Sequence, residues 1–378
     1  MRRREALALL AGAALPWPLS ASGAEPLLEE TAGFAAQIFF VAAKPPALVL
    51  GVTRDGESAV FGFGKRSVDA PEEPKGDTLF RIGSITKVFT GEVLASLAAD
   101  GVVKLADPVT KYAPEFDAVQ SKDRPIRLVD LATHSSGLPR EVPREDGPPG
   151  NPFLHVTREA YVAWMKTNPL LFPPGTAVSY SNFGFDVLAA ALSAAAGKPY
   201  PDLLAERVLT PLGLKDTTFA PAGEQMRRLM QGHNFDGAAM PFVPTSDAIT
   251  GAGGLYSTTD DLLRWLRWHL DRFSGAGAGA RLVDHAAYLW RDGLTTVAGM
   301  DESGHMDAMG LGWVIMNPQG SRPLIMQKSG GLQGIFSYVA FSPARKTGVV
   351  AAINAFDVND AMDMAKVCND LIAELAPR

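Results

Sequence analysis

Short apolar runs rich in β-branched and aromatic residues occur near both ends of the chain. Residues 46–53 (PALVLGVT) and 58–64 (SAVFGFG) flank the sequence RDGE, whose Asp-Gly pair is a strong turn signal. This pattern predicts a β-hairpin. Four more runs near the other end, GLGWVIMN, RPLIMQKS, FSYVAFSP and TGVVAAINA, predict further strands.

Between these runs, from Ser84 to about residue 300, most apolar positions repeat with helical spacing. The clearest segments are KVFTGEVLASLAADG and DLLRWLRWHLDRF. Thr258 and Asp261 stand at capping-box spacing before the second segment. Asp260 and Asp261 are interpreted as charges that favour a helix start. A last helix is expected from about Val358 to Leu375.

The order of these elements predicts an α+β (α/β) fold. One antiparallel sheet would form from both chain ends and be flanked by helices, with a mostly helical domain inserted. The expected division is a sheet subdomain at about 25–83 and 305–378 and a helical subdomain at about 84–304. Residues 274–280 (SGAGAGA) have the composition of a flexible surface loop.

The composition is typical of a soluble globular protein with a sizeable core. Of the 378 residues, 47% are hydrophobic and 20% are charged, and the net charge is −6. No basic stripe with interleaved aromatic residues occurs, so nucleic acid is not an expected partner.

The first 24 residues have the features of an export signal. Three arginines, Arg2, Arg3 and Arg4, precede the apolar segment EALALLAGAAL, and small residues (SASGA) follow it, which predicts cleavage after Ala24. The apolar run is too short to span a bilayer, which takes about 20 residues. Both the Sec and the twin-arginine route remain open. The alternative is an uncleaved amphipathic first helix.

The single cysteine, Cys368, excludes an intrachain disulfide, so stability must come from the core. Cys368 lies in a segment with helical periodicity, and we expect it to be buried by packing. No His, Cys, Asp and Glu residues have the local spacing of metal ligands. We therefore expect no metal and no other cofactor.

Ser84 and Lys87 form an S-x-x-K tetrad where the first long helix is expected to begin. Residues three apart lie on one helix face, so the hydroxyl and the amine could be a nucleophile and its base. The tetrad alone is a weak signal, because a helix-capping serine with a solvated lysine is the simpler explanation of it.

Two further motifs strengthen the catalytic interpretation. Tyr180-Ser181-Asn182 directly precedes a helical run, and Lys328-Ser329-Gly330 ends a predicted strand. The order S-x-x-K, Y-S-N, K-S-G resembles the serine β-lactamase and penicillin-binding protein superfamily. The tyrosine in the second motif resembles its class C branch.

The resemblance extends from about residue 30 to 376. The segments LATHSSGLPRE (131–141), GKPYPDLL (197–204), PLGLKDTTF (211–219) and GAGGLYSTTDDLLRW (251–265) look most like the periplasmic D-alanyl-D-alanine carboxypeptidase/endopeptidase subgroup. His134, in the first of these segments, is interpreted as forming a structural hydrogen bond.

The resemblance implies a role for each motif. Ser84 would be the nucleophile, and Lys87 and Tyr180 would move the protons. The side chains of Asn182, Lys328 and Ser329, with Gly330, would bind substrate. The backbone N–H groups of Ser84 and Gly331 would form an oxyanion hole.

A lysine can accept a proton near neutral pH only if its pKa falls from the usual value of about 10.4. Burial would lower it, and so would a nearby positive charge such as Lys328 or the end of the helix that Ser84 begins. The same influences favour a neutral Lys87 or an anionic Tyr180, and the sequence leaves open which of them is the general base.

The expected function is therefore that of a periplasmic serine hydrolase that forms an acyl-enzyme. As a D-alanyl-D-alanine carboxypeptidase/endopeptidase, it would act on peptidoglycan stem peptides and bind β-lactams, and it could contact the inner membrane peripherally. A class C β-lactamase and a short-chain esterase of the same fold are alternatives. A non-catalytic peptidoglycan-binding protein is a more distant one. The sequence does not indicate an oligomeric state.

Overall fold

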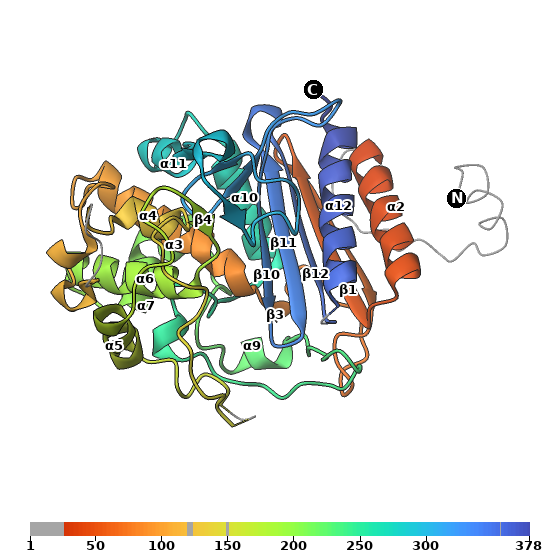
Figure 1. The fold of residues 1–378 in the computed structure, drawn as a ribbon. Helices are drawn as coiled ribbons and strands as arrows, with labels where there is room; N and C mark the ends of the chain where they lie inside the picture. The colour runs from red at the N-terminus through yellow and green to blue at the C-terminus, as the bar shows by residue number, and fades with distance from the viewer. Residues whose placement is uncertain (1–25, 119–123, 149–150, 356) are drawn as a thin grey trace.

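An eight-stranded antiparallel sheet runs through the centre of the protein (Figure 1). The computed structural model describes residues 26–118, 124–148, 151–355 and 357–378. The strand order is β2-β1-β12-β11-β10-β9-β8-β6. The strands are β1 (Ala47–Arg54), β2 (Glu57–Gly64), β6 (Leu289–Trp290), β8 (Ala308–Met309), β9 (Val314–Met316), β10 (Ile325–Leu332), β11 (Ile335–Ser342) and β12 (Thr347–Ile353).

The two ends of the chain meet within this sheet, as the sequence predicts. Strand β1 pairs with β12, and Leu50 lies opposite Ala351. The predicted hairpin is also confirmed, since β1 and β2 are joined by Asp55 and Gly56, both with positive φ. Positive φ at both loop residues is what a two-residue turn between twisted strands requires.

Helices cover both faces of the sheet, which confirms the predicted fold class (Figure 1). Helices α2 and α12 lie side by side on one face, and α10 packs against β1 and β12 on the other. The helices are α2 (Pro26–Ala43), α3 (Thr86–Ala99), α4 (Leu128–Ala132), α5 (Arg158–Thr167), α6 (Asn182–Ala196), α7 (Tyr200–Leu204), α8 (Thr210–Leu212), α9 (Glu224–Arg227), α10 (Thr259–Leu270), α11 (Ala278–Asp284) and α12 (Val358–Leu375). Two short sheets pair β3 (Leu79–Arg81) with β5 (Tyr256–Thr258) and β4 (Val178–Ser179) with β7 (Val297–Ala298).

Alternate residues of the central strands point into two separate apolar cores. Leu48 belongs to the core under α2 and α12, whereas its neighbour Val49 belongs to the core under the other helices. Because side chains alternate along a strand, a sheet covered on both faces needs apolar residues at nearly every position. Cys368 is buried in the first core, as expected, and burial raises the pKa of its thiol.

The predicted subdomain boundary does not separate sheet from helix cleanly. Strand β6 comes from inside the segment expected to be helical, and α10 from the same segment packs on the sheet. The predicted division into two subdomains at residues 84 and 304 stays a prediction, because elements of the middle segment also contribute to the sheet and to its cover. The expected export signal, residues 1–24, lies outside the described residues.

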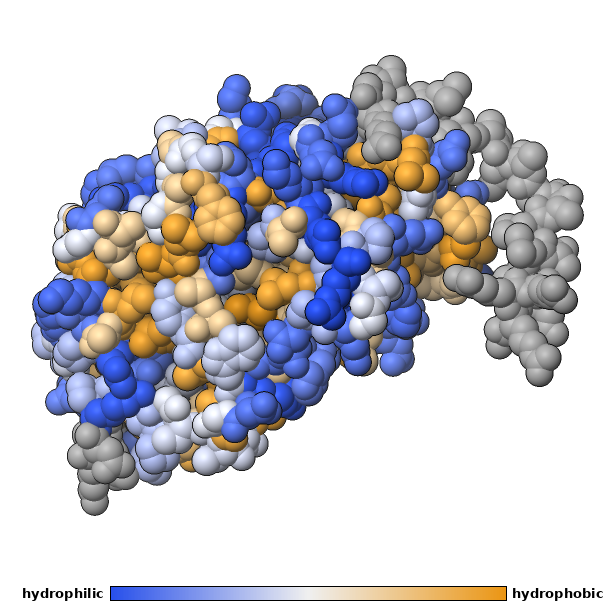
Figure 2. Space-filling model, turned by 90° about the horizontal axis from the view of Figure 1, so that it is seen from above, coloured by the Kyte–Doolittle hydropathy of each residue, from blue (hydrophilic) through white to orange (hydrophobic). Residues whose placement is uncertain are grey.

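Within the described part of the chain, no helix has the length and apolarity needed to cross a bilayer. Polar side chains occupy much of the face seen from above, with apolar ones in groups between them (Figure 2). Helix α2 exposes Leu27, Phe34, Ile38 and Val41. Peripheral membrane contact stays a prediction, and these exposed apolar residues are the described ones nearest in the sequence to the predicted export signal.

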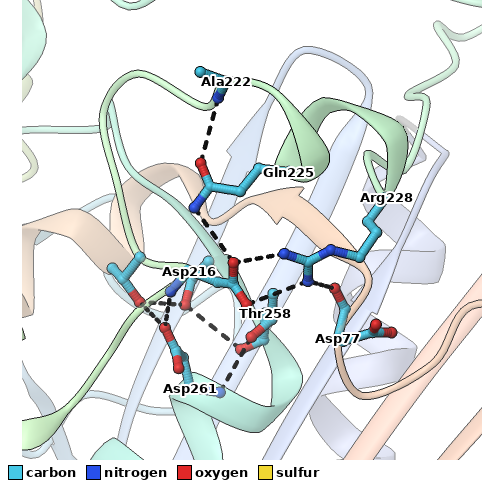
Figure 3. Close-up of polar contacts among 9 residues, drawn as sticks. Asp77, Asp216, Ala222, Gln225, Arg228, Thr258 and Asp261 are labelled. Carbon is cyan, nitrogen blue, oxygen red and sulfur yellow. Dashed lines mark hydrogen bonds and ion pairs between the residues drawn. The ribbon is translucent and has the colours of Figure 1, made fainter.

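The start of α10 differs from the predicted capping box in one respect (Figure 3). Thr258 caps the helix, since its Oγ1 accepts from the Asp261 backbone N–H at 3.2 Å. The Asp261 carboxylate does not return to Thr258. It accepts from the Asp216 backbone N–H at 2.8 Å and from the Thr217 hydroxyl at 3.0 Å. Asp261 therefore anchors a neighbouring loop to the helix start.

The anchored loop is fixed again by Arg228 (Figure 3). Its guanidinium contacts both carboxylate oxygens of Asp216, at 2.6 and 3.2 Å, and donates to the Asp77 carbonyl oxygen at 2.5 Å. A bidentate pair with further hydrogen bonds is more stabilising than a single exposed ion pair.

We predict that Arg228→Met lowers the free energy of unfolding by about 1–2 kcal/mol, since it removes three hydrogen bonds from a partly buried carboxylate and a carbonyl. Urea unfolding measures this change. Arg227→Met is the matched control, because the ion pair of Arg227 with Glu224 is exposed on both sides, and it should leave stability unchanged. Equal losses in the two variants would contradict the prediction.

Candidate active site

Ser84 lies on a one-turn 3-10 helix, Gly83–Ile85, that leads directly into α3. Lys87 is in the first turn of α3, and its Nζ lies 3.2 Å from the Ser84 Oγ. The spacing of three residues thus brings the hydroxyl and the amine together, as the sequence predicts. Ser84 is half-buried and borders a cavity, whereas Lys87 is completely buried.

The Lys87 amine has two other close partners. It donates to the Asn182 Oδ1 at 2.6 Å and to the Ala252 carbonyl oxygen at 2.7 Å. The Asn182 amide, expected from the resemblance to bind substrate, thus also holds Lys87. The Ala252 carbonyl was not predicted, because a backbone acceptor carries no residue-specific signal.

Burial lowers the pKa of Lys87 to about 7. The negative charges of Asp186 and Glu141 oppose this shift, and the positive charge of Arg140 adds to it. Burial is therefore the main cause, rather than a neighbouring positive charge. At neutral pH a large fraction of the amine is uncharged, and an uncharged amine can accept a proton.

The Tyr180 hydroxyl donates to the Ser84 Oγ at 2.5 Å, closer than the lysine. Three basic groups lie over the Tyr180 ring: the Lys87 Nζ at 4.9 Å, the Lys328 Nζ at 4.8 Å and the Arg140 guanidinium at 4.7 Å from its centroid. A ring face attracts cations, so this arrangement gathers positive charge around the phenol.

His134 packs against the ring of Tyr180. Its ring stacks on Tyr180 with centroids 4.6 Å apart, and its Nδ1 accepts from the Ser181 backbone N–H at 3.0 Å. Burial lowers the pKa of His134 well below its usual value, so the ring is neutral and Nε2 carries the proton. The predicted structural hydrogen bond is confirmed.

Asn182 is held by groups that sequence reasoning missed. Its Nδ2 donates to the Glu141 Oε1, and its backbone N–H donates to the Arg140 carbonyl at 2.9 Å. Both partners lie in the segment LATHSSGLPRE, whose residues resemble those of a known family but do not by themselves indicate a contact with Asn182. Ser181 caps α6 by accepting from the Gly184 N–H at 2.9 Å, and this cap fixes the turn that presents Tyr180 and Asn182.

The third motif lies on β10, at the edge of the same cavity. Lys328, Ser329, Gly330 and Gly331 line it together with Ser84 and Tyr180. Burial lowers the pKa of Lys328, and the nearby Lys87 lowers it further. All the site residues predicted from the sequence are therefore brought together, from segments up to about 250 residues apart.

Glycine is required where β10 meets the segment that carries Ser84. A Cβ on Gly330 would lie 2.0 Å from the Ile82 carbonyl oxygen, and one on Gly83 would lie 2.8 Å from the Gly331 nitrogen. Gly83 also has a φ of +48°, which favours glycine. The two backbones can therefore approach closely enough for the Ser84 and Gly331 segments to border one point of the cavity.

Comparisons with known proteins agree with this geometry. The family model described as Beta-lactamase matches residues 35–373. The chain is 40% identical over 330 residues to the D-alanyl-D-alanine-carboxypeptidase/endopeptidase AmpH of Escherichia coli K12, covering 86% of this chain and 84% of that protein. It is 28% identical over 329 residues to a β-lactamase of Pseudomonas fluorescens, covering 81% and 88%.

Solved structures give the same result. A crystal structure of a β-lactamase/D-alanine carboxypeptidase from Yersinia pestis, complexed with citrate, matches with a TM-score of 0.82 and 38% identity, covering 92% of this chain and 98% of that one. A class C β-lactamase structure matches with a TM-score of 0.78 at 20% identity, covering 93% and 97%, which supports the fold. The family match and the 40% identical relative, taken with the converging Ser84, Lys87 and Tyr180, show that this chain belongs to the β-lactamase family.

Proposed function

We propose that this protein is a serine hydrolase that forms an acyl-enzyme and acts as a D-alanyl-D-alanine carboxypeptidase/endopeptidase on peptidoglycan stem peptides. The observation that carries the proposal is the position of the Ser84 Oγ, within hydrogen-bond reach of both the Lys87 amine and the Tyr180 phenol. A nucleophile beside two proton-transfer groups at the edge of a cavity is the arrangement that acyl transfer needs.

In the first step, the Ser84 Oγ attacks the substrate carbonyl carbon, and its proton passes to the Lys87–Tyr180 pair. An uncharged lysine has two N–H donors and one lone pair. If the two donors bind Asn182 and Ala252, the lone pair faces Ser84. The Ser84 and Gly331 N–H groups would stabilise the negative charge that develops on the carbonyl oxygen.

In the second step, the carbon–nitrogen bond breaks, and the departing amine takes the proton from the same pair. Water then attacks the acyl-enzyme and gives its proton to the pair, and the bond to the Ser84 Oγ breaks as Ser84 recovers a proton. Tyr180 suits the transfer to the amine, because its hydroxyl is already in contact with Ser84 and its ring lies against the Arg140 guanidinium and the Lys87 and Lys328 amines.

The charge of the cavity favours substrates with a free carboxylate. Its lining includes two basic side chains, Lys328 and Arg140, one carboxylate, Glu302, and Ser329, which follows Lys328 on β10. A carboxylate accepts strong hydrogen bonds from such groups. Peptides that end in D-Ala-D-Ala and β-lactams both carry one, so both are proposed ligands.

A class C β-lactamase is the second candidate, supported by the 28% identical relative that bears this name. The candidates differ in their products. A carboxypeptidase releases terminal D-Ala from muropeptides, an endopeptidase splits their crosslinks, and a β-lactamase turns over nitrocefin far faster than either peptide reaction. A short-chain esterase would show no preference for a substrate carboxylate, and a non-catalytic binding protein would form no acyl-enzyme.

The proposed location is the periplasm, where peptidoglycan peptides are available. This part of the proposal rests on the arginine-rich and apolar character of residues 1–24.

We predict that a fluorescent penicillin labels the wild-type protein covalently and that Ser84→Ala abolishes the labelling, because the acceptor oxygen is gone. Mass spectrometry of the digested protein should place the adduct on the peptide that contains Ser84. Ser321→Ala, at an exposed position before β10, is the matched control and should be labelled as the wild type is. Equal labelling of Ser84→Ala would refute the assignment.

Acylation should depend on pH through Lys87. The pKa of this amine is lowered to about 7, so protonation removes the proton acceptor as the pH falls below that value. The kcat/KM for penicillin should therefore fall about tenfold per pH unit below about pH 7 and be level above it. Stopped-flow labelling between about pH 5 and 8.5, with circular dichroism to verify folding, measures this profile. A rate that is independent of pH over this range would contradict the role given to Lys87.

Ser329→Ala should lower kcat/KM for a D-Ala-D-Ala peptide by roughly tenfold to a hundredfold, since a hydrogen bond to a charged group is worth about 1.5–3 kcal/mol. Turnover of a neutral p-nitrophenyl ester, which has no carboxylate, should change little. Steady-state assays of both substrates with the same preparation make the comparison. A parallel loss on both substrates would show that Ser329 does not recognise a carboxylate.

A further inference from the structure

A second polar cluster lies in the core, formed by residues of α3, α10 and the end of α11. It consists of Glu92, His269, Asp284 and His285, which are all buried, with exposed fractions of 2%, 0%, 0% and 4%. None of these residues lines the cavity at Ser84. The mechanism proposed above gives them no task, although burying four ionisable groups is costly unless each is satisfied.

Three of these side chains converge on one point. The His269 Nδ1 lies 2.8 Å from the His285 Nε2, and each of these nitrogens lies 3.9 Å from the Asp284 Oδ2. The equidistant point in the plane of the three atoms is about 2.1 Å from each, which is the usual length of zinc–nitrogen and zinc–oxygen bonds. Two imidazoles and a carboxylate are also ligand types that zinc prefers.

Several polar atoms of the cluster have no hydrogen-bond partner. They are the Asp284 Oδ1, next to the proposed ligand atom, and the His269 Nε2 and His285 Nδ1, which are the ring nitrogens opposite the proposed ligand atoms. If the Asp284 Oδ1 also bound the ion, it would be the fourth ligand atom beside the Asp284 Oδ2 and the two imidazole nitrogens. A buried polar atom without a partner is rare in folded proteins, and an ion at this point would account for the Asp284 Oδ1.

The surroundings resemble the outer shell of a metal site. The His269 Nε2, opposite its ligating nitrogen, faces the Glu92 Oε2 at 3.7 Å. A carboxylate behind a histidine orients the ring of a metal ligand. Two tryptophans hold the carboxylates, since the Trp265 Nε1 donates to Glu92 at 2.7 Å and the Trp313 Nε1 donates to Asp284 at 2.8 Å.

The charges of the cluster also favour a cation. Arg281 is the nearby basic residue on α11, but its guanidinium donates to the carbonyl oxygens of Ser274 and Ala276 and lies over the Trp268 ring. It forms no ion pair with Glu92 or Asp284 in the described structure. One guanidinium can balance at most one of the two carboxylates, whereas a divalent ion would balance both.

We propose that His269 Nδ1, His285 Nε2 and the Asp284 carboxylate bind a structural Zn²⁺ ion, with Glu92 orienting His269. The ion would join α10 and α11 directly and α3 through Glu92. It would therefore stabilise the folded protein and take no part in the chemistry at Ser84. The rival is a metal-free network, in which the two imidazoles share a proton through their 2.8 Å contact.

The test uses the full chain, purified without a polyhistidine tag, treated with a strong chelator and then given Zn²⁺ alone. The reconstituted protein should retain about one zinc per chain after gel filtration, and its thermal midpoint should rise by more than about 5 °C over the chelated form. Co²⁺ in place of Zn²⁺ should give the strong visible absorption of a four-coordinate site. No retained zinc together with no thermal shift would overturn the proposal.

Variants locate the site. His269→Gln and Asp284→Asn should each weaken zinc binding more than tenfold, and Glu92→Gln should weaken it about tenfold to a hundredfold through the ring orientation. The control is His305→Gln, since His305 is an exposed histidine between Asp301 and Asp307 that could bind zinc at the surface. Loss of binding in this variant alone would overturn the assignment.

Buried substitutions can prevent folding, so one measurement uses the wild type only. Imidazole ¹⁵N spectra of the chelated and zinc-loaded protein should show the His269 Nδ1 and His285 Nε2 resonances shifting on zinc addition. Unchanged resonances would favour the shared-proton network and refute the zinc site.

Discussion

The burial of one lysine amine is the constraint on which the rest of the site depends. Lys87 is completely enclosed, and its contacts with Ser84, Asn182 and Ala252 come from three separate regions of the chain. The packing that excludes water from the amine is also what brings its pKa to about 7. The packing of the core and the lowered pKa of Lys87 therefore depend on each other. Looser packing would admit water to the amine and raise its pKa, so that the amine would be protonated at neutral pH.

The sheet gives that enclosure its rigidity. Ser84 follows the first hairpin in the chain, whereas the K-S-G motif lies on β10 near the other end. The pairing of β1 with β12 joins these two parts of the chain in one sheet. The backbones of Gly83, Gly330 and Gly331 pack so closely that no larger residue fits at Gly330. The relative position of nucleophile and substrate-binding strand is thus set by backbone contacts, which deform less readily than long side chains.

The sequence was sufficient where the signal is local or repeats along the chain. The hairpin at Asp55 and Gly56, the C-terminal strands and the limits of α12 follow from turn chemistry and periodicity, and the three motifs identify Ser84, Tyr180 and Lys328. The sequence was insufficient where tertiary contacts decide which groups interact. The Ala252 carbonyl binds Lys87, but a backbone acceptor has no residue signature. Asp261 accepts from another loop instead of its own helix, and β6 is a two-residue strand that forms only by pairing with β8. The same reason explains why a search for local ligand spacing misses His269 and Asp284, which are 15 residues apart in the chain.

Helix α3 connects the two polar centres, and its burial explains why both exist. Nearly every residue from Thr86 to Leu97 is buried, so each ionisable side chain on this helix must be neutralised or paired inside the protein. At Lys87 the solution is loss of the charge, which produces a base at the edge of a cavity. Glu92 is buried near a second carboxylate, Asp284, and burial raises the pKa of both groups, to about 8 for Glu92, so their ionised forms are disfavoured without a cation. The proposed cation would stabilise the ionised carboxylates without opening the core to water, and it would give the unpartnered Asp284 Oδ1 an ion to bind.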